Sequence, residues 1–68
     1  MLFRSRGRNR ILQKVGEEAT ETVVAAMSGD RSETIKEASD LLFHLLVALV
    51  ELDIPLEDVA AELESRRK

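Results

Sequence analysis

The chain has 68 residues, a formal net charge of −3 at pH 7 and no cysteine. A chain of this length forms one domain at most, and a core this small gives only marginal stability. The lack of cysteine excludes disulfides, thiolate metal sites and thiol redox chemistry. Two ways of stabilising so small a fold remain: oligomerisation, or a metal ion held by oxygen ligands.

No segment of the sequence is typical of export or of membrane insertion. The arginine-rich start is not followed by an apolar run and a cleavage site, as a secretory signal would be. The longest apolar stretch, Leu41 to Val50, is interrupted by His44 and is far shorter than the ~20 residues that cross a bilayer. We therefore expect a cytoplasmic protein without a membrane partner.

Positive charge is concentrated in the first fourteen residues, at Arg4, Arg6, Arg8, Arg10 and Lys14. Such a concentration can meet nucleic acid or the phosphates of a small ligand. Two phenylalanines are the only aromatic residues, so stacking platforms for single-stranded nucleic acid are poorly supplied. We expect phosphate contact or simple solubility, and no nucleic-acid partner. Solubility is favoured for most of the arginines, because alternate positions scatter around a helix axis.

Helical periodicity begins near Asn9 and predicts a first helix from there to about Ser28. The apolar residues that recur at helical spacing, with Met27 expected in the core, are Ile11, Leu12, Val15, Ala19, Val23, Ala26 and Met27. Gly29 suits a left-handed cap at the end of this helix. Asp30, followed three residues later by Glu33, is typical of a capping box that opens the next helix.

The second helix is predicted from about Arg31 to Leu52, and it is apolar on nearly every side from Leu41 to Val50. Such a helix must be covered all round. One partner helix and a short third helix, opening at Pro55, cannot do this within one chain. A second subunit supplies the missing cover, so we predict an all-α helical hairpin plus a short third helix, forming an obligate homodimer with a four-helix-type bundle.

Acidic residues interrupt both long helices at a regular spacing. Glu18 and Glu21 are three residues apart, and Glu37 and Asp40 repeat that step on the second helix. Antiparallel packing across the short connection lets the two pairs face each other. Four facing carboxylates repel unless cations neutralise them, and oxygen ligands suit Mg²⁺ or Mn²⁺, which also bind phosphate oxygens. The alternative is a solvated helix face with ordinary charge pairs.

Two strings carry a family resemblance. Residues 11–21 read ILQKVGEEATE and residues 37–46 read EASDLLFHLL. Both resemble helices of phosphoribosyl-ATP pyrophosphatases, and both fit the EExxE…ExxD pattern of the wider MazG-like all-α nucleotide pyrophosphatases. The resemblance covers roughly residues 2 to 66. Family members usually begin with a further helix and loop, so we expect residues 1–68 to be a single domain without that helix.

The resemblance implies a Mg²⁺-dependent hydrolysis of phosphoribosyl-ATP to phosphoribosyl-AMP and pyrophosphate, a step of histidine biosynthesis. Position by position, it implies metal ligation by Glu18, Glu21, Glu37 and Asp40. It implies substrate phosphate contact by Lys14 and Arg10, and His44, one turn after Asp40, is a further candidate for substrate binding. It implies a catalytic role for Glu17. This residue would be the base that orients water, a ligand of a second metal ion, or a residue that supports the metal ligands.

Plainer interpretations of several of these residues remain open. Lys14 and Glu18 are four apart and could form only a helix ion pair worth ~0.3–0.5 kcal/mol. His44 could support Asp40, or could be a core histidine with one satisfied hydrogen bond. For the whole chain, the alternatives are a MazG-like hydrolase of noncanonical nucleoside triphosphates and an inactive, truncated helical dimerisation module. The residues alone do not identify the nucleotide.

Overall fold

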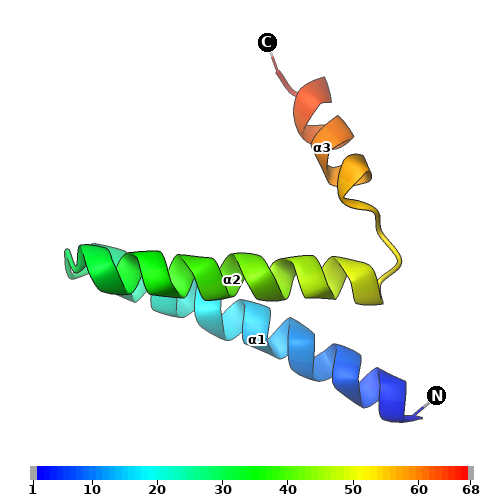
Figure 1. Ribbon diagram of the computed structural model, residues 1–68, viewed down its shortest axis with the longest axis horizontal. Coiled ribbons are helices and arrows are strands. Elements are labelled where there is room, and N and C mark those ends of the chain that lie inside the picture. Colours follow the sequence, from blue (N-terminus) through cyan, green and yellow to red (C-terminus); the bar gives the residue numbers. More distant parts are fainter. Residues whose placement is uncertain (1, 68) are drawn as a thin grey trace.

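The computed structural model describes residues 2–67, which form three helices and no strand. Helix α1 spans Leu2–Met27, α2 spans Arg31–Glu51 and α3 spans Leu56–Ser65. Helices α1 and α2 form an antiparallel hairpin, and α3 projects away from the end of α2 (Figure 1). The predicted all-α class, with a helical hairpin and a short third helix, is confirmed.

The hairpin turn is built as the sequence predicts. Gly29 has a φ of 79°, a left-handed conformation that costs glycine little. Asp30 then caps α2, because its carboxylate Oδ1 accepts a hydrogen bond from the backbone N–H of Glu33 at 2.9 Å. The short turn folds α2 back along α1, which is what brings the two acidic motifs to the same part of the hairpin.

The predicted start of the first helix, near Asn9, is wrong. Helix α1 already begins at Leu2. The prediction depended on apolar periodicity, which the arginine-rich residues before Asn9 lack. Arginine is nevertheless a good helix former, so the backbone continues as a helix without an apolar stripe.

The second break of the chain lies between α2 and α3. Asp53 has a φ of 59°, in the left-handed region that aspartate tolerates better than most residues, and the Ile54 N–H donates to the Leu49 carbonyl at 2.9 Å. Pro55 precedes α3 as its N-cap, one position before the predicted first turn. These two residues end α2 and change the direction of the chain before α3 begins.

The core within one chain is very small. Among the residues whose burial the structure describes, the buried apolar ones are two alanines, Ala25 on α1 and Ala48 on α2. The prediction that Met27 belongs to the core is wrong for the single chain, since this side chain is 84% exposed at the hairpin turn. Within residues 2–67, none of the helices is long and apolar enough to cross a membrane.

Candidate active site

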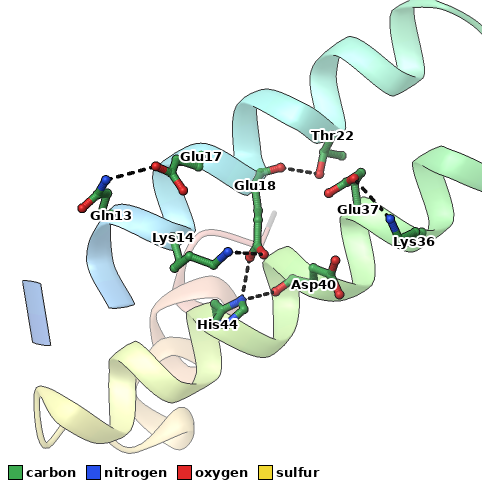
Figure 2. A network of polar contacts seen from close by, with 9 residues as sticks. All are labelled: Gln13, Lys14, Glu17, Glu18, Thr22, Lys36, Glu37, Asp40 and His44. Atoms are coloured by element: carbon green, nitrogen blue, oxygen red, sulfur yellow. Dashed lines mark hydrogen bonds and ion pairs between the residues drawn. The ribbon is translucent and has the colours of Figure 1, made fainter. Parts of the chain in front are cut away.

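The antiparallel hairpin brings the two acidic motifs together midway along its length. Figure 2 shows Glu18 on α1 opposite Asp40 and His44 on α2, with Glu37 further along the same helix face. We call Glu18, Glu21, Glu37 and Asp40 the carboxylate site. Its members come from both helices, as the sequence predicted from the short connection.

Glu18 is the buried member of this site, with 5% of its surface exposed. Its Oε1 lies 2.6 Å from Nδ1 of His44, and its Oε2 lies 3.8 Å from Nζ of Lys14. A buried carboxylate is costly unless it is paired, and these two partners supply that pairing from both helices. Glu18 therefore links α1 to α2 as well as belonging to the carboxylate site.

The contacts of His44 identify the position of its ring proton. Nδ1 lies 2.6 Å from the Glu18 carboxylate and 3.1 Å from the backbone carbonyl of Asp40. A carbonyl and a carboxylate oxygen both accept, so Nδ1 carries the hydrogen and donates it. The ring also meets Phe43 edge to face, with centroids 5.1 Å apart. These contacts fix the ring between α1 and the apolar surface of α2.

Glu37 has a different environment. Its side chain is 14% exposed, and Nζ of Lys36 lies 4.0 Å from its Oε2. Burial raises the pKa of Glu37, and the hydrogen bond to Glu21, with the charges of Glu21 and Glu33, raises the pKa further, while the Lys36 charge lowers it. Glu37 and Glu21 thus form a carboxyl pair across the two helices that resists carrying two negative charges.

This carboxyl pair is chemically suited to a hard divalent cation. Oxygen ligands with an excess of negative charge are what Mg²⁺ and Mn²⁺ prefer, and a bound cation would relieve the repulsion between Glu21 and Glu37. Within residues 2–67, however, no three histidine, aspartate or glutamate side chains gather closely enough to hold a metal ion. The single chain divides the carboxylate site, with Glu18 paired to His44 and Glu21 paired to Glu37.

Two other predicted site residues lie outside this arrangement. Glu17 is exposed, and its Oε2 accepts a hydrogen bond from Nε2 of Gln13 at 3.1 Å on the solvent side of α1. Arg10 is exposed one turn before Lys14. In the described part of the chain, neither residue makes a hydrogen bond or ion pair with the carboxylate site.

The sequence interpretation missed the pairing of Glu18 with His44. The signal was available, because residues roughly equidistant from the Gly29 turn face each other in an antiparallel hairpin. The same rule applies to Arg8, which donates to the Glu51 carbonyl at 3.3 Å at the open end of the hairpin. Thr22 was missed too; its hydroxyl donates to the Glu18 carbonyl at 2.7 Å.

Comparison with known proteins agrees with the two motifs. The family described as phosphoribosyl-ATP pyrophosphohydrolase matches residues 2–67. A phosphoribosyl-ATP pyrophosphatase of Methanococcoides burtonii is 54% identical over 67 residues, which are 98% of this chain and 68% of the relative. Relatives of the same name from Rhizorhabdus wittichii and Listeria innocua are each 56% identical, over 91% and 90% of this chain.

The chain spans 58% of the length of each of these last two relatives. The family match covers both acidic motifs and all three helices, since it extends from residue 2 to residue 67. The chain belongs to the phosphoribosyl-ATP pyrophosphohydrolase family.

Proposed function

We propose that this chain carries out the Mg²⁺-dependent hydrolysis of phosphoribosyl-ATP to phosphoribosyl-AMP and pyrophosphate, a cytoplasmic step of histidine biosynthesis. The observation that carries the proposal is the placement of Glu18 on α1 opposite Asp40 and His44 on α2, in a chain that matches this family over residues 2–67. The names of the relatives supply the substrate.

The proposed metal ligands are Glu18, Glu21, Glu37 and Asp40. When bound there, Mg²⁺ would supply positive charge for the phosphate oxygens and would lower the pKa of a water molecule used in hydrolysis. The chain itself supplies the carboxylates from two facing helices. His44 holds the Glu18 carboxylate by the 2.6 Å contact, so its proposed role at this site is to position Glu18.

Basic side chains on one side of α1 suit the substrate phosphates. Arg10, Lys14 and Glu18 follow each other at four-residue steps and therefore share one side of the helix. The Lys14 side chain is 39% exposed, and its 3.8 Å contact with Glu18 leaves its ammonium group accessible to a phosphate. We propose Lys14 and Arg10 as phosphate contacts. Glu17, exposed beside them, is proposed to orient water or to bind a second metal ion.

The proposed enzyme is a homodimer. On α2, the side chains of Leu42, Phe43 and Val50 are 59%, 61% and 72% exposed. Burying exposed apolar surface of this kind stabilises a protein by about 25 cal/mol for each Å² removed from water. A second copy, packed along this surface, converts two hairpins into a four-helix bundle and supplies the core that each chain lacks.

The experiment is release of pyrophosphate by the 68-residue chain from phosphoribosyl-ATP, compared with ATP and a deaminated purine triphosphate, with and without Mg²⁺. We expect Mg²⁺-dependent release from phosphoribosyl-ATP that Glu37→Gln abolishes, with Glu64→Gln as the exposed control on α3. Preference for the deaminated triphosphate would instead identify a nucleotide-pool hydrolase. Release from none of them, by a folded dimer, would reduce the chain to a dimerisation module.

A further inference from the structure

Helix α3 has an apolar stripe that its own chain leaves largely uncovered, with Val59 alone half-buried. The stripe consists of Leu56, Val59, Ala60 and Leu63, and none of the residues of α3 is buried. Leu56 and Leu63 are 56% and 65% exposed. Figure 1 shows α3 leaving the hairpin at the end of α2 and pointing away from it. An amphipathic helix of ten residues is marginal in water without a packing partner.

A second uncovered apolar surface lies at the other end of the hairpin. There, a hollow of about 300 Å³ is lined by Ala26, Gly29, Arg31, Thr34 and Ile35. Three apolar side chains at this end of the hairpin are exposed: Val24, Met27 and Ile35, of which Ile35 lines the hollow, are 60%, 84% and 54% exposed. We call these three residues and the hollow the turn patch.

Helix α3 cannot reach the turn patch of its own chain. The patch adjoins the Gly29 turn, whereas α3 starts beyond the opposite end of α2 (Figure 1). Helix α2 has 21 residues and is therefore about 30 Å long, while the ten residues of α3 span about 15 Å. Any chain that covers the turn patch with an α3 helix must be another copy.

A two-fold arrangement of the hairpins brings the two surfaces together. If α2 of one copy packs antiparallel on α2 of the other, across the exposed Leu42 and Phe43 near the middle of the helix, each α2 end lies beside the partner's hairpin turn. Helix α3 then emerges next to the turn patch of the partner. The contact occurs twice by symmetry, as an isologous interface requires. A parallel arrangement leaves both surfaces open.

We propose that α3 is an exchanged arm, whose apolar stripe packs on the turn patch of a second copy of this chain. Glu57, Asp58 and Glu62 flank the stripe, and Arg31, which lines the hollow between the acidic Asp30 and Glu33, can pair with one of them. This inference depends on the homodimer of the proposed function, and it specifies how the two subunits are oriented. An exchanged arm also accounts for the connection after α2, where Asp53 and Pro55 direct α3 away from its own hairpin.

The test uses paired cysteines, since the chain contains none of its own. Ile35→Cys combined with Leu63→Cys joins the turn patch to the stripe, and Ile35→Cys combined with Ala61→Cys is the matched control on another side of α3. With mild oxidant or a short bismaleimide, we expect the first pair to form a covalent dimer at least ~10-fold faster than the control, because a disulfide needs Cα atoms within about 7 Å. Met27→Cys with Leu56→Cys provides a second pair if the first fails to fold.

The outcomes separate the arm from the proposed function. A covalent dimer from the stripe pairs, with the control slow, supports the exchanged arm. A link within one chain, or equal rates for both pairs in a dimer seen by sedimentation, overturns the arm. Pyrophosphate release from phosphoribosyl-ATP, measured on the same uncrosslinked protein, shows independently whether the proposed function survives that result.

Discussion

Helix α2 carries ionisable residues on the side that faces α1 and large apolar residues on the side that faces solution. Toward α1, α2 presents Glu37 and His44, which pair with the acids of α1. Toward solution it presents Leu42, Phe43 and Leu46, which are exposed. A single small domain normally places such residues the other way round. This contrast supports both proposals, that the acidic residues between the helices form a site and that the apolar outer side of α2 is half of a dimer core.

The largest effect should come from a charge on the apolar side. Leu46→Asp should prevent assembly and folding together, because a buried carboxylate without a partner costs several kcal/mol. Sedimentation and circular dichroism would measure both losses. Asn9→Asp, at an exposed position of α1, adds the same single negative charge and is the control. A folded, stable Leu46→Asp monomer would show that the outer side of α2 is not a core.

On the charged side, Mg²⁺ should stabilise the fold. A ligand that binds only the native state adds about 2.7 kcal/mol at a hundredfold excess over its Kd. We expect Mg²⁺ to raise the melting temperature, and Mn²⁺ to raise it at least as much. Differential scanning fluorimetry with Glu21→Gln and Asp40→Asn supplies the check. If both variants keep the full response to the cation, the carboxylates are not its ligands.

A smaller loss is expected from the link between the helices. Glu18→Ala leaves the His44 N–H and the Lys14 ammonium without their carboxylate, which should cost about 1–3 kcal/mol in urea unfolding. Glu17→Ala, one residue earlier and exposed, should change stability by less than ~0.5 kcal/mol. Equal losses of stability from the two variants would mean that the contact of Glu18 with His44 does not stabilise the fold.

Much of this arrangement could be predicted from local sequence signals. Gly29 and Asp30 located the turn, and the three-residue steps of the acids indicated which residues would share a helix side. The start of α1 could not be predicted, because the signal used was apolar periodicity and the first residues are polar. The pairing of Glu18 with His44 was also missed: distance from the Gly29 turn places the two residues at a similar level of the hairpin, but the contact itself depends on side-chain conformation, which no short motif encodes.

The smallest effect, and the most specific, concerns the charge of Glu37. Its pKa is raised above the ordinary value of 4.5, first by burial and then by Glu21. The folded state therefore binds this proton more tightly than the unfolded state does. The stabilising contribution is complete below pH 4.5 and is lost as pH rises through the folded pKa. Glu37→Gln stays neutral, so without metal it should melt at or above the parent at neutral pH.

The difference between the melting temperatures of the parent and Glu37→Gln measures the effect of Glu37 alone, because the other carboxylates are the same in both proteins. Without metal, we expect Glu37→Gln to gain on the parent as pH rises from 4.5 toward neutrality. With Mg²⁺ at neutral pH the order should reverse, because only the parent keeps its full set of ligands. Glu64→Gln, an exposed residue 3.3 Å from Arg67, should follow the parent throughout. If Glu37→Gln also follows the parent with and without Mg²⁺, the carboxylate site is an ordinary solvated face, and the catalytic proposal fails although the family assignment stands.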